Sequence, residues 1–162
     1  MKLNYRYDII IDRSLNLKNN LIQDKIEDVL NDPRGWNKLG YIFKKTNTNL
    51  DFVITIVPNK IIKKVCNFDG LSCATMFRSK NKTDIIFLNL EKWQKGSSKS
   101  KLPLDLYRTY LICHETAHIL GKGHIKLEDC KPEIKCPVMV QQTLGIGNLK
   151  PNCWPTKMDS LI

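Results

Sequence analysis

The alternation of hydrophobic and polar residues predicts that the chain begins with a strand and a helix. Residues 5–11 alternate with the period of two that is typical of a half-buried strand. Residues 15–31 place apolar side chains near helical spacing, and Ser14 is the expected N-cap. The apolar positions concerned are Leu15, Ile22, Ile26, Val29 and Leu30. Pro33 and Gly35 then end the predicted helix.

Further strands are predicted in the middle of the chain. Residues 40–45 and 51–57 have the pattern of two strands joined by a polar Thr/Asn turn, and Pro58 ends the second one. Residues 59–66 favour a short helix. The run DIIFLN at 84–89 favours another strand.

The second half of the pattern consists of one long helix and an irregular segment. Residues 95–101 form a Gly/Ser/Lys loop, and Pro103 is a suitable helix start. The helix has apolar side chains at helical spacing, namely Leu104, Leu106, Leu111, Ile112, Ile119 and Leu120. From Gly121 onward Pro, Gly and Cys are frequent and little regular pattern remains. The order of elements predicts an α+β fold in a single domain over residues 1–162.

The composition is that of an ordinary globular domain. The chain has 162 residues, of which 42% are hydrophobic, and its mean hydropathy is −0.31. This length is sufficient to bury a core. No segment is long and apolar enough to span a bilayer. The opening run MKLNYRYDIIIDRS has Asp8 and Asp12 around a short apolar stretch, so we interpret it as a strand and not as a signal peptide.

The net charge of +10 is concentrated in the middle of the chain. Residues 36–103 have thirteen basic and four acidic side chains, so they carry +9 of this charge. The basic positions include Lys44, Lys45, Lys60, Lys63, Lys64, Arg78, Lys80, Lys82, Lys92, Lys95, Lys99 and Lys101. The simpler interpretation is a solvated surface, and the alternative is attraction to an acidic substrate or an anionic surface. Little Arg and no clear aromatic interleaving argue against a nucleic-acid groove.

One run, HETAHILGKGH, carries the chemistry. On a helix, His114 and His118 are one turn apart and project from the same face, so both can reach one metal ion. Glu115 is placed beside them as a base that polarises a water molecule. Gly121 can turn the chain at positive φ, which brings back His124 as a third ligand. Three imidazoles and one open position describe a catalytic Zn²⁺ site.

The long form of this motif, HExxHxxGxxH, is the metzincin signature. A bare HExxH is a weak signal, but the added Gly and third His at the required offsets make coincidence unlikely. The alternative is a helix end with solvated histidines. Against it, the chain has only three histidines, and all of them lie in the motif.

The following run CPVMVQQT places Met139 where a metzincin has a methionine in a tight turn below the metal. Taken alone, Met139 could equally be a generic core residue.

The motifs also resemble one particular group of proteins. YRTYLICHETAHILGKGH, CPVMVQQT and NCWP are similar to an uncharacterised family of bacterial, mostly exported, metzincin-like proteins. The similarity extends to LNDPRGW at 30–36, to the segment from Cys66 to Cys73 and to FLNLEKWQKGS at 87–97, so it covers about residues 5–156. Proteins of that family usually carry an export or anchor segment ahead of this domain, and none is visible here.

The resemblance implies a metzincin-like plan without supplying a substrate. That plan has a mixed sheet with a backing helix and an active-site helix over residues 1–121. A small irregular lower subdomain with the methionine turn follows over 122–162. The strand at 84–89 would form the sheet edge above the metal and pair with an extended peptide, although its Ile/Phe content fits a buried inner strand equally well. The segment 137–144 would form the pocket floor. Some metzincins use a Tyr soon after the methionine, but Val140 and Gln141 follow here, so we expect no such role.

The six cysteines form an even set, which raises a disulfide framework. We predict bridges between Cys66 and Cys73 and between Cys130 and Cys153. The rival interpretation is six reduced thiols or a second metal site, although no CxxC pair exists. An oxidising compartment, such as the extracellular space, is slightly favoured.

Three classes of function remain open. The first is a zinc endopeptidase, in which a metal-activated water attacks the peptide bond and Glu115 is the general base. The second is a zinc-dependent amide hydrolase that acts on a non-protein substrate. The third is an inactive zinc-containing binding module, against which the intact Glu115 argues, because a structural site needs no base. We expect a monomer that acts on a peptide or protein substrate.

Overall fold

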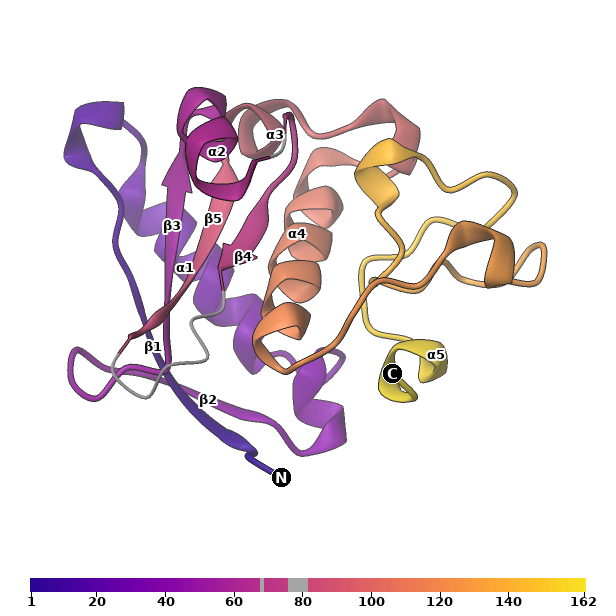
Figure 1. Ribbon diagram of the computed structural model, residues 1–162, viewed down its shortest axis with the longest axis horizontal. Helices are drawn as coiled ribbons and strands as arrows, with labels where there is room; N and C mark the ends of the chain where they lie inside the picture. Colours follow the sequence, from indigo (N-terminus) through magenta and orange to yellow (C-terminus); the bar gives the residue numbers. More distant parts are fainter. Residues whose placement is uncertain (68, 76–81) are drawn as a thin grey trace.

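A computed structural model describes residues 1–67, 69–75 and 82–162, and these residues contain a mixed five-stranded sheet (Figure 1). The strands are β1 (Asn4–Ile9), β2 (Ile42–Lys45), β3 (Phe52–Val57), β4 (Cys73–Thr75) and β5 (Asp84–Asn89). Their order across the sheet is β2-β1-β3-β5-β4. All neighbouring pairs are parallel except β4, which runs antiparallel to β5.

The helices are α1 (Asn19–Asn31), α2 (Asn59–Cys66), α3 (Leu90–Lys95), α4 (Leu104–Ile119) and α5 (Lys157–Ser160). Short 3₁₀ turns η1 to η5 cover Arg13–Leu15, Trp36–Leu39, Ser98–Ser100, Leu127–Asp129 and Gln142–Leu144. The molecule is therefore of the α+β class, as the order of predicted elements indicated. Within the residues that the structure describes, no helix meets the length and apolarity that a bilayer crossing requires.

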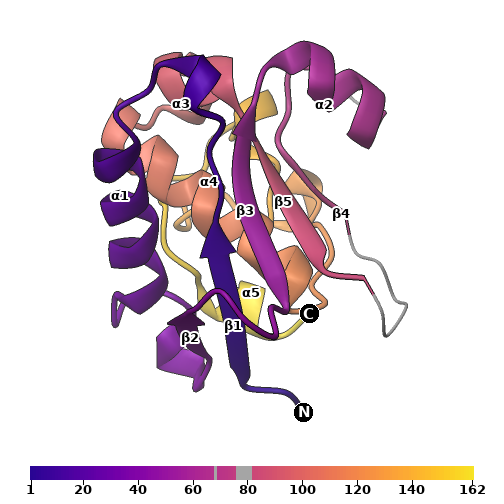
Figure 2. The ribbon, with the colours of Figure 1, turned by 90° about the vertical axis from the view of Figure 1, so that its left-hand side faces the viewer.

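One face of the sheet packs against α1 and α4. In β3 every second residue is buried, and its buried side chains are Phe52, Ile54 and Ile56. The period of two turns these side chains to one face, where the helices cover them. Figure 2 shows the strands β1, β3 and β5 in front, with α4 behind them and α1 at their left. In α1 the buried residues Ile22, Ile26, Val29 and Leu30 form the single apolar stripe that the sequence predicted.

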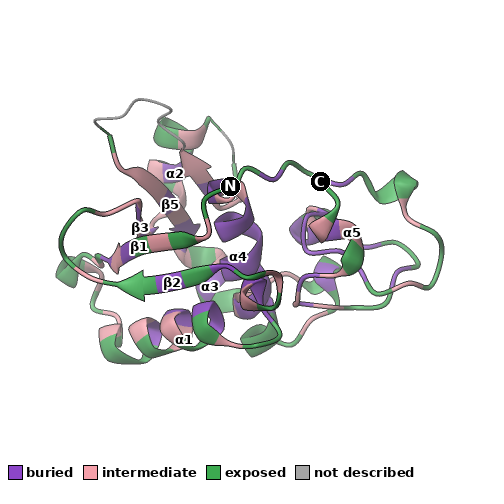
Figure 3. Ribbon diagram, turned by 90° about the horizontal axis from the view of Figure 1, so that it is seen from below, coloured by how far each residue is buried: buried purple, intermediate pink, exposed green. Residues whose placement is uncertain are grey.

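The helix α4 lies between the sheet and the irregular segment that follows Gly121 (Figure 1). Its residues 109–117 are all buried, so α4 shows purple along most of its length in Figure 3, whereas α1 has an exposed side. A helix covered on opposite sides needs apolar residues all round. The first turn is the exception, because Leu104 and Leu106 are 37% and 41% exposed. Their assignment to the apolar face was wrong.

Several predicted details differ from the structure. The strands β2 and β3 are not paired with each other, because β1 lies between them and pairs with both in parallel. Ser14 does not cap α1. It lies in η1, where its backbone N–H donates to the side chain of Asp12, and α1 begins at Asn19. The short elements β4 and α3 were not predicted, since three to six residues give too little periodicity to detect.

The largest correction concerns the edge of the sheet. The strand at 84–89 was expected there, but β5 is an inner strand between β3 and β4. Its run of apolar residues is typical of a strand covered on both sides. The edge position belongs to β4, which follows the segment of Leu71 and Ser72.

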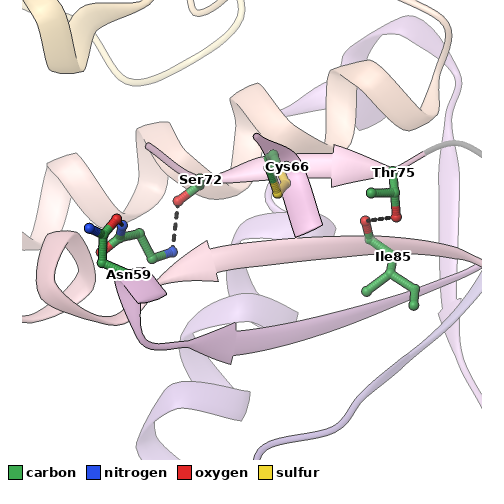
Figure 4. Close-up of a disulfide and its surroundings, with 7 residues drawn as sticks. Asn59, Cys66, Ser72, Thr75 and Ile85 are labelled. Atoms are coloured by element: carbon green, nitrogen blue, oxygen red, sulfur yellow. Dashed lines mark hydrogen bonds between the residues drawn. A yellow bond between two sulfur atoms is a disulfide. The ribbon is translucent and has the colours of Figure 1, made fainter. Parts of the chain in front are cut away.

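The predicted bridge between Cys66 and Cys73 is confirmed. It joins the last residue of α2 to the first residue of β4, with a Cα–Cα distance of 6.2 Å (Figure 4). Beside it, the Ser72 hydroxyl accepts a hydrogen bond from the Asn89 backbone N–H, and the Thr75 hydroxyl donates to the Ile85 carbonyl. The disulfide and these bonds hold the short edge strand against β5. One disulfide is consistent with an oxidising compartment.

Replacing both bridge cysteines by serine, Cys66→Ser with Cys73→Ser, is expected to destabilise the fold. Closing a loop with a sequence separation of 7 restricts the unfolded chain, which is worth about 2–3 kcal/mol. For a chain of this size the midpoint of thermal unfolding should fall by about 5–10 °C. Circular dichroism on heating measures it, with Cys130→Ser as the control. An unchanged midpoint in the double variant would show that the bridge does not constrain the fold.

The predicted bridge between Cys130 and Cys153 is wrong, since both residues are free thiols. Cys130 is half-exposed at the end of η4, and its thiol donates to the Lys126 carbonyl. Cys153 is buried, and its thiol interacts electrostatically with Lys25 and Arg34. The two side chains therefore lie in different surroundings. Sequence proximity within an irregular segment does not set the Cα–Cα distance that a disulfide requires.

Candidate metal centre

The helix α4 and the loop after it bring the three histidines of the chain together. His114 and His118 lie one turn apart on α4, with ring centroids 5.0 Å apart. The ring of His124 lies 5.1 Å from that of His114 and 4.8 Å from that of His118. The three predicted ligand residues thus form one cluster.

Gly121 makes this return possible. The helix ends at Ile119, and Gly121 follows with a φ of +90°, a conformation that L side chains rarely adopt. Its backbone N–H donates to the His118 carbonyl, and the Lys122 N–H donates to the Ala117 carbonyl. These bonds end the helix in a tight turn. The predicted turning role of Gly121 therefore agrees with its backbone geometry.

The nitrogen atoms of the cluster have the spacing of ligands to one ion. One nitrogen from each histidine lies within 4.8 Å of the other two, so the three could hold a metal ion. The Nε2 atoms of His114 and His124 are 3.2 Å apart. Two nitrogens that bind one tetrahedral zinc at 2.0–2.1 Å lie about 3.3 Å apart. The side chains fit a small divalent ion without rearrangement of this pair.

Backbone carbonyls orient the two helix histidines. The Nδ1–H of His114 donates to the Val138 carbonyl at 2.5 Å, and that of His118 donates to the Lys122 carbonyl at 2.9 Å. A carbonyl only accepts, so the proton of each neutral ring lies on Nδ1. The Nε2 atoms are then left with lone pairs directed to the centre of the cluster. Second-sphere bonds of this kind are the usual way in which proteins aim metal-binding imidazoles.

Burial keeps the histidines neutral. Burial, together with the neighbouring His118 and His124, lowers the pKa of His114 to about 3. Burial also lowers the pKa values of His118 and His124 below their usual range. Metal binding requires neutral imidazole, so near neutral pH all three rings are in the form that binds a cation.

Glu115 presents an unsatisfied carboxylate to the same place. Its side chain is buried, and its Oε2 atom has no hydrogen-bond partner among the described residues. Loss of hydration raises its pKa to about 8. A cation at the three histidines would favour the charged carboxylate. A buried oxygen without a partner is costly in a folded protein, which indicates that the site is completed by a ligand.

The cluster opens into a hollow of about 210 Å³. Four segments line it: α4, the loop that carries His124, the start of β4 with the two residues before it, and the stretch after Met139. The lining residues are Leu71, Ser72, Cys73, Ala74, Tyr110, Leu111, His114, Glu115, His118, His124, Gln141 and Thr143. The segment 137–144, which was predicted to form the floor of the pocket, contributes Gln141 and Thr143 to this lining. The part that residues 71–74 play in this lining was not predicted from the sequence. The signal that could have indicated it is the predicted disulfide of Cys73, which fixes this segment in place.

Met139 lies in a tight turn on the far side of the histidines. The Val140 N–H donates to the Pro137 carbonyl across this turn, and Met139 is fully buried. The Met139 carbonyl accepts from the Ile125 N–H, directly after His124. The turn thus contacts both ends of the ligand set, since the Val138 carbonyl also holds His114.

Two tyrosines of α4, which the sequence did not single out, fix the stretch after this turn. The hydroxyl of Tyr110 donates to the Val140 carbonyl and accepts from the Gln142 N–H. The Tyr107 hydroxyl lies 2.7 Å from the Thr143 hydroxyl. The ring of Tyr110 also packs against that of His114, with 5.4 Å between the ring centroids. These contacts hold the wall of the hollow close to the face of α4 that carries His114 and His118.

The basic residues do not line this hollow. The described lysines of the middle segment lie on η2, β2, α2, α3, η3 and the neighbouring loops, and none of the residues that line the hollow is Lys or Arg. Lys45 pairs with Glu27 at 3.6 Å, and Lys63 pairs with Asp69 at 3.3 Å. Arg78 and Lys80 fall outside the described residues. In the described part, the positive charge is a property of the surface around the site.

The sequence profile of a family described as "Protein of unknown function (DUF3152)" matches residues 1–155. The chain belongs to this family. No curated protein matches the chain. The chemistry of the site must therefore be judged from its own geometry.

Proposed function

We propose that this member of the DUF3152 family is a zinc-dependent endopeptidase with a metzincin-like fold. One observation carries the proposal: three neutral histidines and an unpartnered, buried Glu115 converge on one hollow. A structural metal site needs ligands but no base. A hydrolytic site needs both, together with an open side for substrate. His124 is exposed, which leaves the cluster accessible from outside.

His114, His118 and His124 would hold the ion through one nitrogen each. Nitrogen ligands and a tetrahedral spacing favour zinc over calcium or magnesium, which prefer oxygen ligands. When bound, zinc supplies a Lewis acid that polarises a carbonyl and makes water acidic near neutral pH. The remaining chemistry belongs to the side chains around it.

Glu115 acts as the general base in this proposal. Its buried Oε2 has no partner among the residues that the structure describes, and in this proposal it accepts a proton from the attacking water. The same carboxyl group can then deliver that proton to the leaving amine. The burial that raises the pKa of Glu115 also favours the protonated carboxyl group that exists between these two proton transfers. The stretch 140–143 has no tyrosine, and the nearby hydroxyl of Tyr110 is already engaged with that stretch.

The edge strand supports a peptide as substrate. Within the described sheet β4 is the edge strand and pairs on one side with β5, and the segment that leads into β4 lines the hollow. An extended peptide could add to the free side through main-chain hydrogen bonds. The disulfide and the bond from Asn89 to Ser72 hold this segment in place before a substrate arrives. The role first expected of residues 84–89 is therefore assigned to β4.

The metzincin-like plan has independent support from the arrangement of elements. A mixed sheet is covered by α1 and by a helix with two of the histidines, and a glycine turn leads to the third. An irregular segment with Met139 in a tight turn follows. This order is compatible with the upper and lower parts that the HExxHxxGxxH motif implies, and in this respect it supports the proposal.

The proposal is tested by profiling cleavage of a peptide library by zinc-loaded wild type beside Glu115→Gln. We expect new peptide termini with the wild type and none above background with the variant. A zinc-loaded wild type that cleaves no peptide would contradict the proposal. Hydrolysis of small amides alone would then favour the non-protein substrate. Zinc binding without any hydrolysis would favour the binding module.

Raising the salt concentration should change kcat/KM for acidic and neutral peptides to the same extent. Because no described lysine lines the hollow, surface charge should contribute little to substrate choice. The Debye length falls from about 10 Å at 0.1 M to about 3 Å at 1 M, which screens surface steering. The measurement is kcat/KM for an acidic peptide and a neutral one across this range. A loss of about tenfold or more for the acidic peptide alone would instead show that the lysines steer substrate.

A further inference from the structure

Asp159 is a buried carboxylate that lies outside the metal-binding motif. The residue is 0% exposed, and it belongs to the short helix α5. Its Oδ1 accepts from the Met139 N–H at 2.9 Å, and its Oδ2 accepts from the Val138 N–H at 3.1 Å. The Thr156 N–H and hydroxyl donate to Oδ2 at 2.6 and 2.8 Å. Four donors from two distant segments therefore meet on one side chain.

The bonds of Asp159 continue directly to a metal-binding side chain. Val138 donates its N–H to Asp159, and its carbonyl accepts the Nδ1–H of His114 at 2.5 Å. The position of that carbonyl determines where the imidazole points. The Asp159 carboxylate holds two successive N–H groups of the turn and so sets the orientation of His114 through the Val138 carbonyl.

The same segment reaches the other helix histidine by a separate route. The buried side chain of Lys122 donates to the Ile162 carbonyl at 3.0 Å and lies over the ring of Trp36. The backbone carbonyl of Lys122 accepts the Nδ1–H of His118 at 2.9 Å. Residues 156–162 are therefore in contact with the supports of both helix histidines.

We propose that Asp159 is a positioning residue of the metal site, which acts by holding the 137–140 turn so that Val138 orients His114. This inference rests on the proposed metal site. Burying a carboxylate costs several kcal/mol unless its bonds compensate. An apolar side chain would pack this turn at a smaller cost. What the carboxylate adds is a fixed direction for the N–H groups of Val138 and Met139 and for the Val138 carbonyl that lies between them.

The test measures metal binding by the full chain without substrate. Asp159→Asn keeps the shape of the side chain but turns an amide donor toward N–H groups that also donate. We expect its affinity for Zn²⁺, measured by chelator competition, to fall by about 10–100-fold, as for other outer-sphere partners. The absorption spectrum of the Co²⁺-loaded variant should also change. Asp129→Asn, at an exposed position in η4, is the matched control and should bind as the wild type does.

A second control separates positioning from stability. Phe52→Leu removes buried volume from β3, where the ring packs against Tyr5, Tyr7 and Phe43. It should lower the unfolding midpoint without changing Zn²⁺ affinity or the Co²⁺ spectrum. If Phe52→Leu weakened Zn²⁺ binding as much as Asp159→Asn does, the proposal would be overturned, because general destabilisation of the fold would then explain the loss of affinity. A folded Asp159→Asn with wild-type affinity and spectrum would overturn it too.

If Asp159→Asn does not fold, Asp159→Glu decides. The additional methylene displaces both oxygens while keeping the charge, so weaker Zn²⁺ binding is expected and wild-type binding overturns the proposal. Both readouts use the metal alone. A chain that binds zinc tightly and cleaves no peptide would therefore contradict the proposed function and leave the role of Asp159 intact.

Discussion

Glu115→Gln is expected to lower kcat for peptide hydrolysis by about 10²–10⁴-fold, the range that a positioned general base contributes. The amide has the shape of the carboxyl group but cannot accept the proton of the attacking water. The Oε2 atom that it replaces is buried and unpartnered, so no bond within the described residues is lost. The unfolding midpoint should not fall. Zinc should remain at one ion per chain, measured by elemental analysis beside the kinetics.

Glu128→Gln makes the same chemical change at an exposed position of η4 and should leave both quantities unchanged. The informative comparison is between metal content and rate. If zinc content falls together with kcat, Glu115 is a ligand and its role as a base is wrong. If the rate is unchanged while zinc stays bound, the hydrolytic assignment of the site is wrong.

His124→Ala is expected to weaken zinc binding by more than about 100-fold, since loss of an outer-sphere partner alone costs 10–100-fold. The Nε2 of His124 lies 3.2 Å from that of His114, so its removal takes away one edge of the ligand set. His124 is exposed, whereas His114 is buried against Tyr110. The substitution should therefore affect the metal more than the fold. Zinc competition and thermal unfolding of the metal-free chain measure the two effects separately.

Lys126→Ala, two residues further along the same loop and also exposed, is the control. Peptide hydrolysis should disappear in His124→Ala at low zinc and return in part when zinc is raised. Wild-type zinc affinity in the variant would show that only the helix histidines bind metal. The site would then have the short HExxH form, and the third ligand would have to be sought elsewhere.

The sequence determined the local geometry of the site because that geometry depends on a few consecutive residues. Helical periodicity places His114 and His118 one turn apart, and Gly121 supplies the positive φ that turns the chain toward His124. The same local reasoning located α2 at 59–66 and β5 at 84–89 with their observed bounds. A period and a turn residue require no knowledge of the rest of the fold.

The sequence was less informative about which segments become neighbours. Nothing in residues 40–57 indicates that β1 lies between β2 and β3, since strand order is set by packing across the whole sheet. The three residues of β4 are too few to show a period, yet their place at the edge gives them a wall of the hollow. Likewise, Cys130 and Cys153, which were predicted to pair because both lie in the irregular segment, are free thiols.

The three histidines, Glu115 and the glycine turn that brings His124 back were therefore predicted from the sequence alone. Tertiary structure decided what holds them in place. Val138 orients His114, and Asp159 holds Val138 from 21 residues further along the chain. Ligand identity and spacing follow from covalent and helical geometry over a few ångströms. Second-sphere contacts join atoms that come together only when the core forms, so no pattern in neighbouring residues encodes them.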